Sequence, residues 1–395
     1  MAGLYIHIPF CASRCIYCGF YSTTSLKLRQ RYVDAVCREM IYRGEKLEVR
    51  DERIETVYLG GGTPSQLTIP QLEQLFLYIN NVYSLTTHPS PLTPEITIEM
   101  NPDDVTPMFA EVLPRLGVNR LSMGAQTFSN ERLKWLHRRH TAEQVPQAIK
   151  LLRDNGIRNI SIDLMYGFPD ETLDDWQRDI DTALALNVEH LSAYCLMIEE
   201  GTILYERLKM KDEKLKEHNG DCPLNEELER QMYELLIDKL TAAGYEHYEI
   251  SNFAKPGYRS RHNSSYWQDI PYIGLGAAAH SYTVLGGSSS ETTAVRSWNV
   301  ADIHQYIEAI ERGELPSEKE VIDEDTHYND RITVALRTSD GLDLTTLSDR
   351  HRRYCLKEAQ RFLDDGLLQL SDNRLSLTRK GLFVSDYIMS SLIMV

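Results

Sequence analysis

The sequence has no hydrophobic run long enough to cross a membrane. No stretch approaches the roughly 18 to 20 consecutive apolar residues that a transmembrane helix needs, and the apolar tail from Tyr387 to Val395 is far too short. The first residues, MAGLYIHIPF, carry neither the basic region nor the long apolar segment of a secretory signal. We therefore expect a cytoplasmic protein without a transmembrane segment.

The sequence has fewer basic than acidic residues. Lys and Arg total 42 against 58 Asp and Glu, which gives a formal net charge of −16. Binding of nucleic acid by bulk electrostatics requires many Lys and Arg contacts to phosphate, so this balance has the wrong sign. We expect no nucleic-acid partner.

Cysteine is scarce, with 7 in 395 residues, so the sequence does not encode a disulfide framework. Cys11, Cys15 and Cys18 are nevertheless clustered, in the segment CASRCIYC. Clustered thiols in a reducing compartment indicate a metal site. Cys195, Cys222 and Cys355 are isolated, as is typical of small buried hydrophobic residues.

Short apolar segments alternate with longer helical patterns along the first half of the chain. The expected strands span residues 4–8, 56–60, 95–100, 120–126, 159–167 and 190–198. The expected helices span residues 27–42, 69–83, 107–116, 142–155 and 173–186. This alternation predicts an α/β fold whose parallel strands are joined by right-handed crossovers.

Polar, Gly and Pro residues follow nearly every expected strand. The segments are PFCASRC, GGGTPS, EMNPDD, GAQTFS and DLMYGFP. Ligand chemistry in parallel α/β folds lies at the C-terminal ends of the strands. A ring of such loops favours a partial (β/α)6 TIM-like barrel over an open doubly wound sheet, in which only the switch point is used.

The chain length corresponds to two or three domains at about 150 residues each. We predict a partial barrel over residues 1–200, a flanking extension over 201–310 and a smaller C-terminal helical, winged-helix-like domain over 311–395. Within the extension, residues 199–239 are highly charged and are expected to form solvated helices, and residues 245–282 are expected to be loop-like and aromatic.

The C-x3-C-x2-C spacing after the first strand places three thiolates on one short loop. Three thiolates can hold three corners of a [4Fe-4S] cluster and leave the fourth iron open to a small molecule. The alternative is a structural zinc site, which needs a fourth ligand such as Cys37 or His7. Zinc cysteines usually come as paired knuckles, and the sequence has no second C-x2-C.

Several motifs occur in order: IHIPFC, YLGGGTPS, IEMNP, LSMGAQTF, IDLMYGFP and HNSSYW. With the cysteine spacing, they resemble the radical S-adenosylmethionine (SAM) superfamily. More narrowly, they resemble the oxygen-independent coproporphyrinogen III oxidase (dehydrogenase)-like family and its heme chaperone branch. The resemblance covers most of the chain and implies a [4Fe-4S] cluster and S-adenosylmethionine as cofactors.

The resemblance also implies a nucleotide site. Gly61, Gly62 and Thr63 match the loop that holds the methionine amino group, and Glu99 matches the carboxylate that completes this contact. Taken alone, the glycines are equally consistent with a tight turn, and Glu99 with a helix cap or a surface charge.

Further residues of the implied site follow later strands. Gln126 and Asp163 match positions that bind the ribose hydroxyls. Arg138 matches an arginine that pairs with the methionine carboxylate, although the adjacent Arg139 makes the assignment ambiguous by one residue. Tyr5 and Met165 are expected at the adenine, and Met165 is equally consistent with a core position.

Details of the sequence distinguish the two branches of the family. The dehydrogenases resemble C-x3-C-x2-C-x-C, whereas this sequence has Phe20 at the last position, and they carry an N-terminal extension that is not found before the first strand here. The segment RHNSSYW resembles the H-N-x-x-Y-W motif of the chaperone branch, with His262 the candidate heme iron ligand and Tyr266 and Trp267 beside the porphyrin.

The resemblance therefore implies a heme chaperone that delivers heme to an acceptor protein, with a membrane respiratory cytochrome as one such acceptor and a homodimer as one assembly. The alternative is a dehydrogenase that decarboxylates the propionates of coproporphyrinogen III to vinyl groups. An RNA-modifying radical enzyme is disfavoured, because the sequence lacks a basic surface and additional clustered cysteines.

Overall fold

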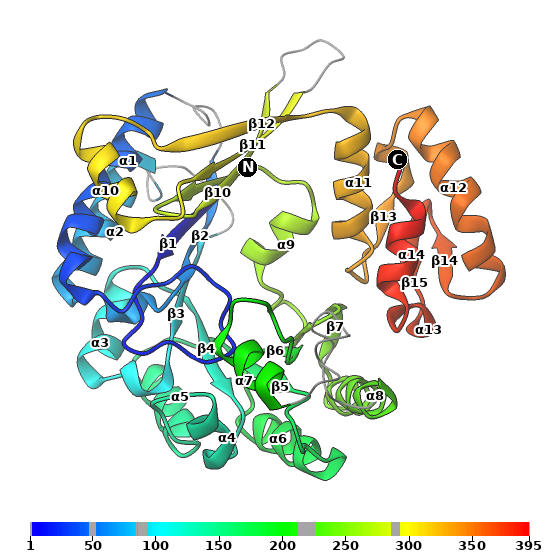
Figure 1. Ribbon diagram of the computed structural model, residues 1–395, viewed down its shortest axis with the longest axis horizontal. Coiled ribbons are helices and arrows are strands. Elements are labelled where there is room, and N and C mark those ends of the chain that lie inside the picture. The colour runs from blue at the N-terminus through cyan, green and yellow to red at the C-terminus, as the bar shows by residue number, and fades with distance from the viewer. Residues whose placement is uncertain are drawn as a thin grey trace.

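The computed structural model describes residues 2–46, 53–83, 85, 93–211, 226–285 and 293–394 (Figure 1). A 12-stranded sheet runs in the order β12-β11-β10-β9-β1-β2-β3-β4-β5-β6-β8-β7. Helices cover its outer face, and the C-terminal helices form a separate group beside it. The two edge strands, β12 and β7, do not pair with each other among the described residues, so the barrel is open.

The six central strands are parallel and confirm the predicted barrel core. They are β1 (Ala2–Ile8), β2 (Ile54–Gly61), β3 (Glu95–Met100), β4 (Arg120–Gln126), β5 (Asn159–Tyr166) and β6 (His190–Cys195). The connecting helices are α1 (Arg29–Lys46), α2 (Ile69–Tyr83), α3 (Pro107–Arg115), α4 (Asn130–Trp135), α5 (Gln144–Asp154) and α6 (Leu173–Ala185). The short helix α4 was not predicted from the sequence.

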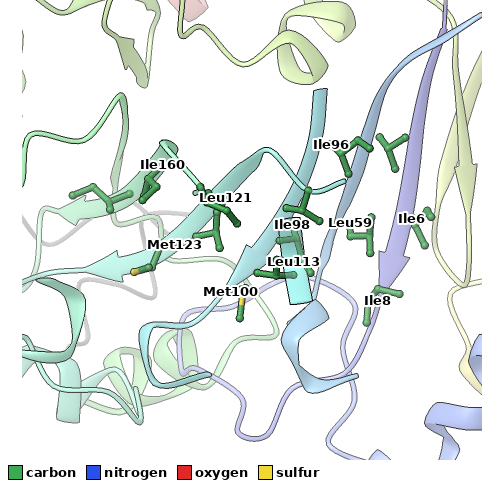
Figure 2. Close-up of a cluster of buried hydrophobic side chains, with 14 of the residues drawn as sticks. Ile6, Ile8, Leu59, Ile96, Ile98, Met100, Leu113, Leu121, Met123 and Ile160 are labelled. Atoms are coloured by element: carbon green, nitrogen blue, oxygen red, sulfur yellow. The ribbon is translucent and has the colours of Figure 1, made fainter. Parts of the chain in front are cut away.

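The outer face of the sheet supplies the main hydrophobic core. Side chains at alternate positions of a strand face the same way, and Leu4, Ile6 and Ile8 of β1 are all fully buried against the helices. Figure 2 shows equivalent side chains on β2 to β5, including Leu59, Ile98 and others. Burial of one such side chain stabilises the fold by about 1.5–3 kcal/mol.

The inner face of the same strands is polar. Between the outward-facing apolar residues of β1 lie Tyr5 and His7, which face the barrel interior and share a hydrogen bond between Tyr5 OH and His7 Nδ1 (3.0 Å). Equivalent positions on the following strands carry Thr56, Tyr58, Glu95, Glu99, Arg120, Ser122, Ser161, Asp163, His190 and Ser192. TIM barrels usually fill their interior with branched apolar side chains, and the polar interior of this barrel departs from that pattern.

Residues that follow β6 add strands to both edges of the sheet. They are β7 (Glu246–Glu249), β8 (Asn252–Ala254), β9 (Tyr272–Leu275), β10 (His280–Leu285), β11 (Thr293–Asn299) and β12 (Ser317–Ile322). The expectation of a loop-like segment over residues 245–282 was therefore wrong. Strands of three or four residues with Gly and Pro nearby give too little alternation to be recognised in the sequence.

The extension also contains helices α7 (Ile203–Lys211), α8 (Glu226–Ala242), α9 (Arg261–Trp267) and α10 (Ile303–Glu311). Helix α8 is more than a solvated surface helix, because it buries Met232, Leu236 and Leu240 and packs against α6. Trp176 Nε1 of α6 donates a hydrogen bond to the carbonyl of Met232 (3.0 Å). Cys222 and the charged residues 212–225 lie outside the described residues.

The C-terminal unit has its own hydrophobic core, which includes Ile332, Phe362 and Leu375. Its elements are α11 (Glu324–Ala335), β13 (Leu342–Asp343), the 3-10 helix η5 (Leu344–Thr346), α12 (Asp349–Asp364), β14 (Leu368–Ser371), β15 (Arg374–Leu377), α13 (Arg379–Leu382) and α14 (Ser385–Leu392). This order of helices and hairpin matches the winged-helix-like pattern expected from the sequence. The preceding strand β12 pairs with β11, so it belongs to the barrel sheet.

Candidate functional site

A cavity of about 630 Å³ opens at the C-terminal ends of the central strands. The loops after β1, β2, β3, β4 and β6 contribute to its lining, and β5 contributes the strand residues Asp163 and Met165. It is lined by the following residues of the sequence-derived site: Cys11, Cys15, Cys18, Gly61, Gly62, Thr63, Glu99, Gln126, Arg138, Asp163 and Met165. The fold thus brings together residues that are far apart in the chain. Cys11 and Asp163, for example, are about 150 positions apart.

Cys11, Cys15 and Cys18 lie on the loop after β1 and are partly exposed to this cavity. Thr63 Oγ1 donates to Cys11 Sγ (3.6 Å), and Arg138 Nη1 donates to Cys15 Sγ (3.6 Å). Burial raises the pKa of the Cys11 and Cys18 thiols. The described residues contain no group of three or more His, Cys, Asp or Glu side chains placed around a single metal ion. The three thiols of the loop therefore open into the same cavity.

The residues considered as a fourth zinc ligand are engaged elsewhere. Cys37 is buried in the hydrophobic core between α1 and its neighbours. His7 Nδ1 is hydrogen-bonded to Tyr5 OH, and His7 Nε2 to the carbonyl of Tyr21 (3.0 Å). Neither residue lines the cavity, and this placement argues against a closed tetrahedral zinc site.

The glycine loop after β2 packs directly on the end of β1. Gly61 has a φ of +101°, and a Cβ there would lie 2.4 Å from the ring of His7. A Cβ on Gly62 would lie 2.7 Å from the carbonyl oxygen of Ile8. Glycine is therefore required at both positions by the protein's own backbone and side chains, and the close packing brings Thr63 against Cys11.

Glu99 and Asp163 are two carboxylates at the base of the cavity. Glu99 accepts hydrogen bonds from Tyr58 OH (2.7 Å) and from the backbone N–H of Gly61 (3.2 Å). Burial is the main cause that raises the pKa of Glu99 to about 7 and that of Asp163 to about 6. Carboxylates in such surroundings favour a cationic ligand, which would stabilise their ionised forms.

Arg138 and Arg139 both line the cavity, and their contacts distinguish them. Arg138 Nη2 donates to Asn101 Oδ1 and to the carbonyl of Gly124, both at 2.6 Å. Its Nε is buried and has no hydrogen-bond partner among the described residues. Arg139 instead forms ion pairs with Asp103 (2.8 Å) and Asp104 (2.7 Å). An unpartnered buried guanidinium nitrogen is suited to a ligand carboxylate.

Gln126 and Met165 line the cavity, but Tyr5 does not. Gln126 adopts a φ of +67°, which is strained for a residue with a side chain and is typical of functional sites. The expected adenine contact of Tyr5 is not supported by its position. Tyr5 precedes His7 on the inner face of β1, so its ring lies deeper in the barrel, beside Tyr58 and His262.

His262 lies on α9, at the opposite end of the barrel from the cysteine loop (Figure 1). The backbone N–H groups of Arg261 and His262 donate to the Glu95 carboxylate (3.1 and 3.0 Å) at the start of β3. The ring of His262 is 1% exposed. Hydrogen bonds join its Nδ1 to Thr56 Oγ1 and its Nε2 to Tyr266 OH, both at 2.8 Å. Both ring nitrogens are thus occupied, and burial lowers the pKa of His262 to about 3.

Comparison with known proteins reveals the family. Residues 5–183 match the Radical SAM superfamily model, and residues 322–384 match the HemN C-terminal domain model. The chain is 35% identical over 389 residues to the heme chaperone HemW of Bacillus subtilis, covering 96% of each chain. It is 36% identical over 298 residues to the heme chaperone HemW of Escherichia coli, covering 74% of each. The chain belongs to the HemW family of the radical SAM superfamily.

Membership of the HemW family confirms the resemblance seen in the sequence. The fold also matches a solved structure, the coproporphyrinogen III oxidase HemN of Escherichia coli, with a TM-score of 0.78 at 22% identity over 99% of this chain and 89% of that chain. At this identity the match supports the shared architecture of barrel and C-terminal domain alone.

Sequence reasoning missed several residues around the site of this HemW-family chain. Tyr58 holds Glu99, Asn101 holds Arg138, and Arg120 lies buried in the barrel interior. All three residues lie in the expected strands or directly after them, where no motif marks them. The available signal was the two-residue periodicity, because Tyr58 and Glu99 fall on inward-facing positions of β2 and β3.

Proposed function

We propose that this protein is a heme chaperone that carries a [4Fe-4S] cluster, S-adenosylmethionine and heme and delivers the heme to an acceptor protein. The observation that carries the cofactor part is the single cavity shared by the three thiols, the Glu99 carboxylate and the unpartnered Nε of Arg138. The names of the relatives, which match nearly the full chain, support the chaperone part.

The donor set of this cavity suits the cofactors. Cys11, Cys15 and Cys18 would hold the cluster, which when bound supplies one electron at an iron open to ligands. Glu99 would bind the ammonium group of S-adenosylmethionine, and Arg138 would bind its carboxylate. Gly61, Gly62 and Thr63 shape the cavity wall beside the cluster, Gln126 and Asp163 would hold the ribose, and Met165 would contact the adenine.

The chaperone is favoured over the dehydrogenase by one position in the cysteine loop. Phe20 occupies the place of a fourth loop cysteine and its side chain is 71% exposed at the cavity rim. An exposed aromatic side chain beside the cavity suits contact with another molecule. The acceptor would be a heme protein, for which a membrane respiratory cytochrome is our candidate, and a homodimer is our candidate assembly. Among the described residues, no helix is both long and apolar enough to span a bilayer.

Ligation of heme iron by His262 would require a rearrangement of α9. The imidazole must release its Nε2 or Nδ1 hydrogen bond before it can bind a metal. Displacement of Tyr266 would free Nε2, and the low pKa of the ring ensures that it is neutral at pH 7. We therefore propose His262 as an iron ligand that becomes available when α9 moves.

The experiment is a hemin titration followed by the shift of the heme Soret absorption. We expect a saturable shift in the wild-type protein that His262→Ala abolishes and that His304→Ala, a change at an exposed histidine of α10, leaves unchanged. Formation of protoporphyrinogen from coproporphyrinogen under anaerobic, reducing conditions would favour the dehydrogenase instead and would overturn the proposal.

A further inference from the structure

Arg120 is an arginine of the barrel interior, and only 1% of it is exposed. It is the first residue of β4 and faces inward, as does Ser122 two residues further along the strand. Ser122 lines the cavity beside the cysteines, whereas Arg120 does not. Arg120 therefore lies one layer below the cavity and does not touch a ligand bound there.

Arg120 does not link neighbouring strands through hydrogen bonds. It forms no hydrogen bond and no ion pair within the part of the chain that the structure describes, and its buried Nε lacks a partner. Thr97 on β3 and Asn159 on β5 flank it in register, and each keeps a buried side-chain oxygen that no described residue contacts through a hydrogen bond. A buried charge without bonds costs stability, so the guanidinium needs compensation from charges at a greater distance.

The compensating charges are the Glu99 and Asp163 carboxylates at the base of the cavity. Ser122 is paired in register with Glu99 and donates from Oγ to Asp163 Oδ1 (3.3 Å), so both carboxylates lie in the layer above Arg120. Burial raises the pKa of both carboxylic acids, and the charge of Arg120 opposes this effect. Such an interaction through space is stronger in the protein interior than in water, because the dielectric constant is lower.

We propose that Arg120 is a positioning residue for S-adenosylmethionine, because its charge keeps Glu99 and Asp163 ionised without touching the ligand. This inference rests on the proposed function, in which Glu99 binds the ammonium group and Asp163 the ribose hydroxyls. An ionised carboxylate accepts hydrogen bonds with both oxygens, so a protonated Glu99 or Asp163 would bind the ligand less well. Arg120 thus extends the pH range of cofactor binding towards lower pH.

The histidines and tyrosines around these carboxylates hardly change charge between pH 6.5 and pH 9. Burial lowers the pKa of His7, His190 and His262, in His262 to about 3, so their rings are mostly neutral. Burial raises the pKa of every tyrosine that faces the cluster, which are Tyr5, Tyr58, Tyr194, Tyr248 and Tyr266. Glu95 binds two N–H groups of α9, and Arg138 stays protonated as arginine does in proteins. Differences between variants in this pH range therefore report on Glu99 and Asp163.

The test is calorimetric titration of the reconstituted protein with S-adenosylhomocysteine between pH 6.5 and pH 9. We expect Arg120→Gln to weaken binding by about five- to tenfold at pH 6.5, because loss of the charge raises the pKa of both carboxylic acids and leaves more of them protonated. At pH 9 the carboxylates are ionised with or without Arg120, so the two affinities should agree within about twofold. Arg120→Lys keeps the charge and should follow the wild-type profile.

The control is Arg158→Gln, which removes the charge of an exposed arginine before β5 and should leave the affinity unchanged at every pH. If Arg120→Gln does not fold, Arg120→Lys carries the test, because a purely structural need for the guanidinium would weaken its binding equally at all pH values. Such a uniform loss in either variant, or wild-type affinity of Arg120→Gln at pH 6.5, would overturn the proposal. Failure of the wild type to bind S-adenosylhomocysteine at any pH would instead remove the cofactor part of the proposed function.

Discussion

At the scale of single residues, the cavity beside the cysteines depends on ionisable groups held in unfavourable surroundings. Glu99 and Asp163 are kept partly buried, and Arg138 retains a buried Nε without a partner. Each of these features costs stability in the ligand-free protein, and each is relieved by a ligand that carries both an ammonium and a carboxylate group.

Glu99→Gln should stabilise the ligand-free protein at pH 8 more than at pH 5. The pKa of Glu99 is raised from 4.5 to about 7, so between these values the folded protein keeps a proton that the unfolded chain has lost. The wild type therefore loses stability as the pH rises through this window, whereas glutamine cannot ionise. Melting temperatures of both proteins at several pH values test this, and a difference that does not change with pH would contradict it.

Arg138→Gln should weaken binding of S-adenosylhomocysteine by about tenfold or more, because it removes a charge-assisted contact to the ligand carboxylate. Arg139→Gln is the matched control, since Arg139 pairs with Asp103 and Asp104 instead. Calorimetric titration of the reconstituted protein measures both affinities. Equal losses in the two variants would show that general electrostatics, and not the position of Arg138, determine binding.

At the scale of elements, the short helix α9 is stabilised by contacts at its N-terminus. Ser260 caps the helix by accepting from the N–H of Asn263 (3.3 Å), and the Glu95 carboxylate accepts two further N–H groups. An isolated helix of this length would not be stable in water. Its position, and hence that of His262 and Trp267, is set by Glu95 on β3 rather than by its own sequence.

Glu95→Gln should therefore loosen α9 by removing the charge from two backbone hydrogen bonds at a buried site. We expect a loss of about 1–3 kcal/mol in the free energy of unfolding, or of local opening if α9 detaches alone. Hydrogen exchange of the amides of residues 261–267 measures this, with Glu111→Gln on the surface of α3 as the control. If these amides are as well protected from exchange in Glu95→Gln as in the wild type, side-chain packing, and not Glu95, determines the position of α9.

The sequence predicts the helices and strands whose apolar residues recur at a regular spacing. It does not predict the short elements that lack this pattern. Helix α2, for example, spans Ile69–Tyr83 as expected, because its apolar positions recur at helical spacing. Strands β7 and β8 were missed because so few residues carry the alternation. The burial of His262 also could not be read from its motif, since it depends on Thr56, Tyr58 and Glu95 from distant strands.

At the scale of the whole molecule, the described residues form one large core under the barrel sheet, a small cluster that includes Ile16 and Met165, and a separate core in the C-terminal unit. Contacts across the boundary between the barrel and the C-terminal unit include the ion pair of Arg337 with Glu249 (2.9 Å) and that of Arg259 with Asp340 (3.1 Å), together with an edge contact between the rings of Phe383 and Tyr233. Boundaries of this kind allow the two bodies to unfold separately.

Leu375→Ala should consequently destabilise the C-terminal unit while leaving the barrel intact. Leu375 is fully buried in the smaller core, and truncation of such a side chain costs about 2–5 kcal/mol through lost burial and the cavity left behind. We expect an earlier first transition in urea, with unchanged iron content after anaerobic reconstitution, because the cavity beside the cysteines includes no residue of this unit. The matched change Leu59→Ala, in the core beneath the barrel, should instead reduce the iron content. A single urea transition and a reduced iron content in both variants would mean that the two bodies form one cooperative unit.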